Sequence, residues 1–281
     1  MDDMSDEDTD GYGFWTRSVH EGAEPDPTTG ARAPSIQQTT SYVFDDADHA
    51  ARLFALEEEG YIYSRLLNPT VARLGERLAS LESGVGAVPT SSGMASFDLA
   101  NFLLASAGDN IVSSSSLYGG TYTYLTHTVE RRGVETRFVD TLDYDAYAEA
   151  IDEDTAYVHL ETIGNPALVT PDIERIADIA HEHDTPLFVD NTFATPYLCR
   201  PIEHGADLVW GEHADRFPEL GAENPAYHGV NFAERFGEAA LTYAGIARGL
   251  RDLGSAQSPF DAWATMQKLE SLPMRMDRHC A

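Results

Sequence analysis

The sequence predicts an α/β fold with a mostly parallel sheet and helices on both of its faces. Short apolar segments of strand length alternate with segments of helical periodicity from about residue 85 to residue 190. Such alternation is typical of a parallel sheet whose crossover helices cover both faces. The run from Leu187 to Val189 has the length and composition of a strand that is buried on both faces.

Asp190, Asn191 and Thr192 follow directly after that run and mark the expected ligand-binding edge of the sheet. The carboxyl ends of parallel strands border the crevice where open α/β sheets bind ligands. This position favours a ligand-binding role for Asp190. The alternative is an aspartate that only caps a loop or a helix.

The chain before the sheet begins with a polar segment. Residues 1–32 are acidic and rich in glycine and proline, and they are expected to form an arm without a core. Asn68 followed by Pro69 predicts a helix start, because asparagine caps helices and proline fits the first helical position. Apolar residues recur at helical spacing up to Leu81, and Gly84 is expected to end this helix.

Strands and helices then alternate with short connections. The expected strands cover residues 85–89, 110–112, 135–139, 157–160 and 185–190. The expected helices cover residues 47–56, 92–104, 118–131, 145–151, 170–180, 232–253 and 258–272. We therefore expect an N-terminal arm over residues 1–60 and a large domain over residues 61–257. Residues 258–281 are expected to start with a helix, because Ser258 and Pro259 are a helix-start signal.

The net charge of −29 is extreme, because 47 acidic residues face 18 basic ones and Lys268 is the single lysine. A nucleic-acid or anionic-membrane partner is not expected, since such partners need basic patches. A carboxylate-rich, lysine-poor surface suits a protein that is kept soluble in high salt. The sequence therefore supports the hypothesis of a halophilic source, which a stability maximum at low salt would contradict.

Cysteine use and hydropathy indicate a cytoplasmic protein. Cys199 and Cys280 form no disulfide framework, no metal-ligand spacing is present, and both are expected to be small core residues. No apolar run has the length of a membrane span. Residues 1–10 are acidic where a signal peptide would be basic.

Several residues outside the Asp190 segment could bind a ligand. Ser92, Gly93 and Met94 open a predicted helix, and N–H groups at a helix N-terminus bind phosphate, although a capped turn is the alternative. Tyr118 beside two glycines is either a turn residue or a flat ring presented to a ligand. Arg65, near Tyr63, is a rare cation or an exposed partner of a carboxylate. Together with Asp190, these residues match the needs of pyridoxal phosphate.

Eight motifs in one order extend this interpretation from about Ser18 to Cys280. They are Asp26 to Arg32 (DPTTGAR), Gln38 to Phe44 (QTTSYVF), Tyr63 to Thr70 (YSRLLNPT), Ser92 to Met94 (SGM), Asn110 to Thr121 (NIVSSSSLYGGT), Glu161 to Pro166 (ETIGNP), Val189 to Pro196 (VDNTFATP) and Cys199 to Asp207 (CRPIEHGAD). In these motifs the chain resembles the Cys/Met-metabolism family of pyridoxal-phosphate enzymes, and it is most similar to the O-acetylhomoserine sulfhydrylase branch. The resemblance implies an aspartate-aminotransferase-like large domain of fold type I.

The resemblance also implies roles for individual residues. Tyr118 would stack on the pyridine ring and Asp190 would pair with its nitrogen, and both would therefore serve catalysis. The cofactor phosphate would bind Ser92, Gly93 and Met94, while Asn165 and Thr192 would line the site. Tyr63 and Arg65 would reach the phosphate of an adjacent subunit, which implies a homodimer or a homotetramer that acts on a small amino-acid substrate.

The chain departs from the family pattern after Asp207 to Trp210, where the family carries its Schiff-base lysine in a Ser-x-Thr-Lys sequence. Trp210 is followed directly by Gly211-Glu-His, so we expect an internal deletion at 210/211 that removes the lysine. Lys268 is not expected to replace it, because a Schiff-base amine must be desolvated and aimed at the aldehyde. The small C-terminal domain of the family is also expected to be missing, which would leave Trp263 and Leu269 exposed.

Three functions remain open from the sequence. The first is conversion of O-acetylhomoserine and sulfide to homocysteine and acetate, impaired here by the loss of the lysine. The second is a noncatalytic remnant that binds pyridoxal phosphate or pairs with a complete paralogue. The third is a cystathionine γ-synthase or γ-lyase type of enzyme.

Overall fold

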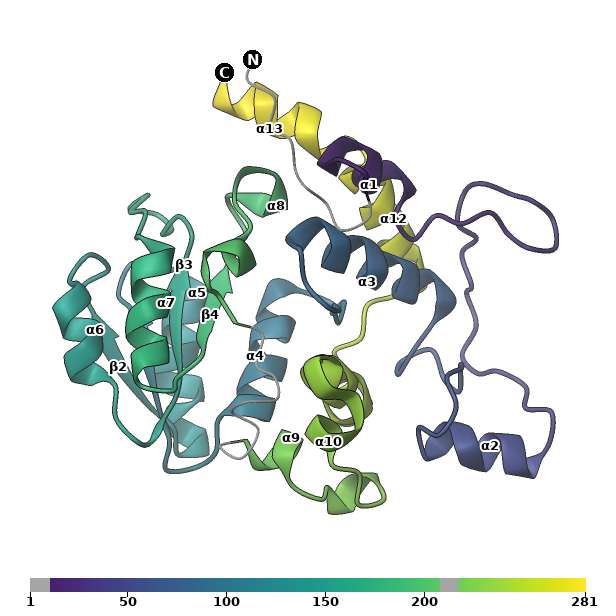
Figure 1. Ribbon diagram of the computed structural model, residues 1–281, viewed down its shortest axis with the longest axis horizontal. Coiled ribbons are helices and arrows are strands. Elements are labelled where there is room, and N and C mark those ends of the chain that lie inside the picture. Colours follow the sequence, from purple (N-terminus) through teal and green to yellow (C-terminus); the bar gives the residue numbers. More distant parts are fainter. Residues whose placement is uncertain (1–10, 208–216) are drawn as a thin grey trace. The chain divides into compact units, whose positions relative to one another are not determined.

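The computed structural model describes residues 11–207 and 217–281 (Figure 1). Contacts divide the chain into two compact units. Unit 1 contains the residues up to Ser96 together with Ile246 to Ala281, and unit 2 contains Phe97 to Gly245. The domain boundaries expected at residues 60 and 257 stay predictions.

Unit 2 contains a four-stranded sheet in the order β2-β1-β3-β4, and every pair of neighbouring strands is parallel (Figure 1). The strands are β1 (Asn110–Ser114), β2 (Glu135–Val139), β3 (Thr155–Glu161) and β4 (Leu187–Asp190). The expected parallel α/β fold is confirmed. Within the described residues β4 is an edge strand, and its residues after Leu187 are only half-buried, so it is not buried on both faces as predicted.

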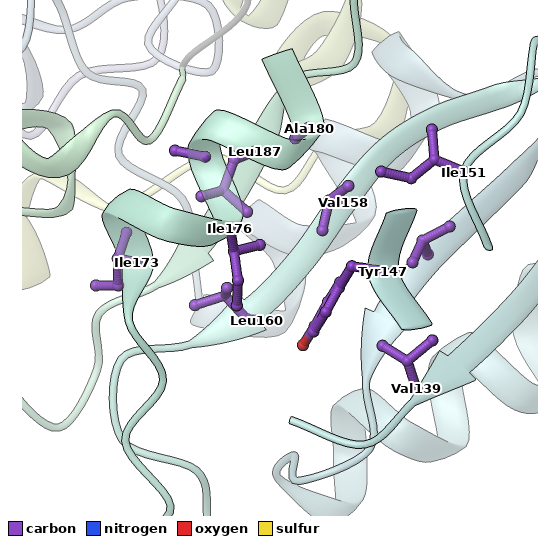
Figure 2. Close-up of a cluster of buried hydrophobic side chains, with 11 residues drawn as sticks. Val139, Tyr147, Ile151, Val158, Leu160, Ile173, Ile176, Ala180 and Leu187 are labelled. Atoms are coloured by element: carbon purple, nitrogen blue, oxygen red, sulfur yellow. The ribbon is translucent and has the colours of Figure 1, made fainter. Parts of the chain in front are cut away.

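Two helices, α6 (Tyr144–Ala150) and α7 (Ile173–Glu182), cover one face of the sheet. The core beneath them joins branched side chains of the strands to the apolar stripe of α7, as Figure 2 shows. Its buried members are Val112, Val139, Tyr147, Ile151, Val158, Leu160, Ile173, Ile176, Ala177, Ala180 and Leu187. The stripe of α7 was predicted from its spacing, but the helix starts later than expected because Asp172 is its N-cap.

The opposite face of the sheet packs on aromatic and amide side chains. Most of α4 (Gly93–Leu104) lies there: the ring of Phe97 stacks on Phe188 at 5.5 Å, and Asn101 Oδ1 accepts a 2.8 Å hydrogen bond from the Tyr157 hydroxyl. The next helix, α5 (Gly119–Thr123), continues as a π-helical segment from Tyr124 to Thr128. Both helices begin close to where the sequence predicts.

Unit 1 is built around α3 (Pro69–Glu82), which contacts α1 (Phe14–His20) and α12 (Pro259–Leu269). Asn68 caps α3 as predicted, because its side-chain oxygen accepts from the N–H of Thr70 at 2.9 Å. The end of α3 differs from the prediction. Ser83, and not Gly84, takes the left-handed conformation, and Gly84 donates its N–H to the carbonyl of Ala79.

Two expectations for unit 1 are wrong. The N-terminal segment contains α1, in which Phe14 and Ser18 are buried, so it is more than an arm. Residues 85–89 form no strand, and only an isolated antiparallel bridge joins Thr90 to Ala256. Pro89 has no N–H for a sheet and Gly86 weakens a strand, so the apolar residues alone did not predict the structure of this segment.

The C-terminal helices also correct the sequence analysis. Leu269 was expected to be exposed but is buried on α12, and Trp263 is half-buried, because α12 packs on α3. Cys280, at the end of α13 (Leu272–Cys280), is exposed and is not a core residue, whereas Cys199 packs against the core of unit 2.

The remaining helices are short. They are α2 (Ala47–Phe54), α8 (Thr195–Leu198), α9 (Pro218–Gly221), α10 (Phe232–Phe236), α11 (Ala240–Ala244) and a π-helical segment from Gly245 to Leu253. The single helix expected over residues 232–253 is therefore interrupted, and Gly237 breaks it with a φ of 52°. Among residues 11–207 and 217–281, no helix is both long enough and apolar enough to cross a membrane.

Candidate functional site

The carboxyl ends of β3 and β4 bring two acidic side chains together at one edge of the sheet in unit 2. Glu161 and Asp190 are direct neighbours in the parallel register of these strands. The N–H of Thr162 donates to the backbone carbonyl of Asp190 at 3.0 Å, which continues the pairing past the last residue of β3. The position expected for Asp190, at the end of a parallel strand, is confirmed.

The Asp190 carboxylate has one oxygen that is fully engaged and one that is open. Oδ1 accepts from the N–H of Thr192 at 2.9 Å and from its hydroxyl at 2.5 Å. Among the described residues, none donates a hydrogen bond to Oδ2. A half-buried carboxylate held in this way can accept a charge-assisted hydrogen bond from a ring N–H. Asp190 therefore fits the nitrogen of a pyridine ring.

Tyr118 presents a half-exposed aromatic ring at the start of α5. Its side chain is 50% exposed, and its backbone N–H donates to Oε1 of Glu161 at 2.6 Å. The ring lies against Gly120, where any side chain would displace it. One side of the ring is thus supported by backbone, and the exposed part of the ring can offer a stacking surface for a ligand.

Glu161 is the central residue of this edge, and the sequence analysis gave it no role. It is 6% exposed, and its second oxygen accepts from the N–H of Asn165 at 2.9 Å. Burial raises the pKa of Glu161, the two backbone N–H groups oppose that rise, and the nearby charge of Asp190 adds to it. One carboxylate therefore joins the loops that carry two predicted site residues, Tyr118 and Asn165.

The same two loops touch at a glycine. A Cβ atom at Gly164 would lie 2.7 Å from the carbonyl oxygen of Ser116, too close for any side chain. Glycine is therefore required at position 164 by a close backbone approach. The signal was present in the sequence, because Gly164 stands between Glu161 and Asn165, but periodicity does not show which backbones meet.

His159 lies on the same face of β3 as Glu161 and is fully buried. Its Nδ1 is 3.0 Å from the carbonyl oxygen of Phe188, and a carbonyl can only accept, so Nδ1 carries the proton. Burial lowers the pKa of His159 to about 4, although the charge of Asp190 and the carbonyl of Phe188 oppose this. The imidazole is therefore neutral at neutral pH.

This histidine predicts a pH dependence of stability. Its pKa is lower in the folded state than the usual value of about 6.5, so the unfolded state binds the proton more strongly. The contribution is fully present above pH 6.5 and is lost as the pH falls toward 4. We expect the free energy of unfolding to decrease by about 2 kcal/mol between pH 7.5 and 5 for this group alone.

Denaturant titrations of the protein and of His159→Gln at both pH values measure this contribution. Glutamine can still donate to the carbonyl of Phe188 but does not titrate, so the variant should lose this part of the pH dependence. His204→Gln, which changes an exposed histidine, is the control and should retain it. If the free energy of unfolding falls equally between pH 7.5 and 5 in the unchanged protein and in His159→Gln, His159 is not the cause of the pH dependence.

The predicted phosphate-binding residues lie in unit 1, at the first turn of α4. Ser92 is the N-cap, since its hydroxyl oxygen accepts from the N–H of Ala95 at 3.1 Å. Gly93 follows it and is exposed, and a Cβ atom there would meet no atom within 4 Å. First-turn N–H groups have no acceptor inside a helix, so the start of α4 can present backbone donors to an anion, and the phosphate contact expected for Gly93 and Met94 stays a prediction. A shared pocket of Ser92 and Asp190 stays a prediction.

Tyr63 and Arg65 lie together on the surface of unit 1. The guanidinium carbon of Arg65 is 5.5 Å from the centre of the Tyr63 ring, and Arg65 also donates to the backbone carbonyl of Arg251. Both side chains are exposed. Their expected contact with the phosphate of an adjacent subunit stays a prediction, as do the homodimer or homotetramer, the cytoplasmic location and the halophilic source.

Two places in the chain bear on the Schiff-base lysine: the expected deletion at 210/211 and Lys268. The deletion expected at 210/211, with Trp210, lies outside the described residues. Lys268 is exposed on α12 and so lacks the desolvation that a reactive amine requires. In the part of the chain that the structure describes, no cluster of histidine, cysteine or acidic side chains could hold a metal ion.

Comparisons with known proteins identify the class and then the family. A crystal structure assigned as an O-acetylhomoserine (thiol)-lyase from Campylobacter jejuni, which contains N'-pyridoxyl-lysine-5'-monophosphate, superposes with a TM-score of 0.91 at 35% identity. The superposition covers 95% of this chain and 72% of the chain in that crystal structure. The fold is therefore that of pyridoxal-phosphate-dependent enzymes of fold type I. The family described as Cys/Met metabolism PLP-dependent enzyme matches residues 15–281, and the chain belongs to this family.

Two curated relatives have names of sulfhydrylase or homocysteine synthase type. A homocysteine synthase of Schizosaccharomyces pombe is 45% identical over 95% of this chain and 68% of its own length. An O-acetyl-L-homoserine sulfhydrylase of Leptospira meyeri is 43% identical over 94% of this chain and 67% of its own length. The resemblance to this family that the motifs indicate is confirmed.

The aligned length differs from the length of this chain. The match to the S. pombe relative runs over 293 positions, whereas 95% of 281 residues is about 267 residues. About 26 aligned positions of the relative, the difference between 293 and 267, therefore have no counterpart in this chain.

Proposed function

We propose that this chain is an O-acetylhomoserine sulfhydrylase-type protein that binds pyridoxal phosphate without a covalent bond. The complete enzymes of this branch convert O-acetylhomoserine and sulfide to homocysteine and acetate. The observation that carries the proposal is the exposed position of Lys268, the one lysine of the chain. Membership of the family indicates that the cofactor is pyridoxal phosphate. The chain contains no buried lysine among its described residues to which this cofactor could attach.

The residues of unit 2 support the binding of the cofactor ring. Asp190 offers the open Oδ2 to the pyridine nitrogen, and Tyr118 offers its ring for stacking. The expected phosphate contact of Gly93 and Met94, which lie in unit 1, remains a separate prediction. When bound, pyridoxal phosphate supplies an electron-withdrawing ring that stabilises negative charge on the substrate. Asp190 strengthens that effect by keeping the ring nitrogen protonated.

The missing amine sets the expected activity. In the family the lysine also moves protons on the substrate, and a positioned acid or base contributes roughly 10²- to 10⁴-fold in rate. The hydroxyl of Tyr118 is only a weak substitute for this amine. We therefore infer that homocysteine formation by this chain is lost or very slow. The difference of about 26 aligned positions supports an internal deletion.

Borohydride reduction tests this proposal directly. The purified chain is incubated with pyridoxal phosphate, reduced, and analysed by mass spectrometry. We expect dialysis to remove the cofactor, and we expect reduction to leave no stoichiometric covalent adduct on the chain. The Lys268→Gln variant should behave in the same way. A complete sulfhydrylase of the family, treated identically, is the positive control and should retain a covalent adduct on its lysine.

Three results would contradict the proposal. A stoichiometric adduct on Lys268 that disappears in Lys268→Gln would show that this lysine replaces the missing one. Formation of homocysteine from O-acetylhomoserine and sulfide at the rate of the control would show that no lysine is needed. If the chain does not bind the cofactor at all, the remaining function is a noncatalytic remnant.

A further inference from the structure

The loops at the carboxyl edge of unit 2 are joined by a single buried carboxylate. Glu161 accepts the Tyr118 N–H at 2.6 Å on one oxygen and the Asn165 N–H at 2.9 Å on the other. Both oxygens are thus used by backbone donors of two different loops. Because an ionised carboxylate only accepts hydrogen bonds, it suits two convergent N–H groups better than any neutral side chain does.

Both loops are also constrained from a second direction. Gly164 touches the backbone of Ser116, so the loop before Asn165 lies directly on the loop before Tyr118. The Tyr118 ring lies against Gly120, so the backbone of Gly120 supports the ring from one side. The carboxylate fixes the backbone of each loop, and the two glycines allow the close approach.

We propose that Glu161 is a positioning residue that sets the distance between the Tyr118 ring and the Asp190 carboxylate. Glu161 and Asp190 are neighbours in the register of β3 and β4, so the N–H of Tyr118 is tied to the strand beside Asp190. A planar ligand that contacts both groups requires such a fixed distance. This inference rests on the proposed function, since the ligand is pyridoxal phosphate.

The distance matters because stacking and hydrogen bonding are made by different elements. Asp190 belongs to β4, whereas Tyr118 belongs to the connection between β1 and α5. A loop without this anchor would have to be ordered when the ligand binds, and ordering lowers affinity. Glu161 removes that cost by holding the loop before the ligand arrives.

Two substitutions separate the reach of the side chain from its charge. Glu161→Gln is nearly isosteric, but the NH2 group that replaces one carboxylate oxygen cannot accept, so one of the two N–H groups loses its partner. Glu161→Asp retains the charge but is one methylene shorter, so it cannot reach both donors. Glu135→Gln, an exposed glutamate on β2, is the matched control.

Hydrogen exchange of the ligand-free protein is the first measurement. We expect the amides of Tyr118 and Asn165 to be protected in the protein and in Glu135→Gln. At least one of the two should exchange about tenfold faster or more in each Glu161 variant, since bonds to charged acceptors are strong. The amide of Val112 in β1 should not change, which shows that the sheet remains folded.

The second measurement is the induced circular dichroism of bound pyridoxal phosphate, together with its affinity. We expect the induced band to be lost or strongly reduced in Glu161→Gln at saturating cofactor, with affinity about tenfold lower or more. A residue that only supported the fold would weaken binding without changing the signal of the bound cofactor.

The outcomes separate the two proposals. Unchanged exchange of the Tyr118 and Asn165 amides in both Glu161 variants would overturn the positioning role, whatever the cofactor does. Faster exchange in a protein that binds no pyridoxal phosphate would overturn the proposed function and leave Glu161 as the anchor of these loops only. Faster exchange together with a lost induced band supports both.

Discussion

Replacing Asp190 with asparagine is expected to weaken pyridoxal phosphate binding about 10- to 100-fold, the factor that corresponds to about 1.5–3 kcal/mol. Asparagine can still accept both hydrogen bonds from Thr192 on its oxygen. Its NH2 group, however, donates where the open Oδ2 of aspartate accepts. The substitution therefore removes one function of the side chain and preserves its shape. Equilibrium titration of the ligand-free protein with the cofactor measures the effect.

The structure offers a matched control for this prediction. Asp140 directly follows β2 at the same edge of the sheet, and its Oδ1 also accepts the N–H of the residue two positions later, Leu142. Asp140→Asn changes the net charge equally, and we expect it to bind the cofactor as the unchanged protein does. Equal affinities for Asp190→Asn and Asp140→Asn would refute the assignment of Asp190 to the ring nitrogen.

Replacing Arg77 with leucine is expected to destabilise unit 1 by about 3–5 kcal/mol. Arg77 on α3 is 1% exposed and donates to three backbone carbonyls. Nε bonds Glu21 at 2.8 Å, Nη2 bonds Val19 at 3.1 Å, and Nη1 bonds Met266 at 3.2 Å. Burial lowers the pKa of Arg77, while the charges of Glu270 and Glu21 oppose that shift.

The size of this effect follows from what leucine leaves behind. The carbonyls of Val19 and Glu21 lie in the last turn of α1 and at its C-cap, where the helix has lost its own donors. A buried carbonyl without a donor costs about 1–3 kcal/mol. Lysine cannot replace arginine, because a point charge does not match three spread acceptors.

Denaturant-induced unfolding checks the prediction on Arg77, with Arg73→Leu as the control. Arg73 lies one turn earlier on α3 and makes a single 3.4 Å bond to the carbonyl of Glu24 near the surface. Both substitutions remove one positive charge from a very acidic chain, so repulsion changes equally. We expect Arg73→Leu to cost less than about 1 kcal/mol. Similar stabilities of the two variants would contradict the anchoring role of Arg77.

Local sequence signals predicted much of the fold because their causes are local. Asn68 and Pro69 fixed the start of α3 through capping chemistry that involves neighbours in the chain. The apolar spacing of α7 and the strand ending at Asp190 were also visible without the structure. Where these signals failed, as at residues 85–89, the apolar residues indicated a strand that Pro89 and Gly86 oppose.

The candidate site divides in the same way. Tyr118 and Asp190 were found from the sequence because a ring beside glycines and an acid after a strand are local patterns. Glu161, His159 and Gly164 were missed, because their roles depend on contacts with residues 20 or more positions away. The ETIGNP motif contains Glu161 and Gly164. A motif does not show, however, which groups form hydrogen bonds or which strand residues are paired.

The sequence by itself determined the α/β class, the family and the absence of any lysine except Lys268, since composition and motif order do not depend on coordinates. Only the tertiary structure decided that Glu161 joins two loops, that His159 is buried beside the Asp190 strand, and that Lys268 is exposed. The physical reason is that burial and hydrogen bonding are set by residues that the fold brings together, and a linear pattern does not contain those neighbours.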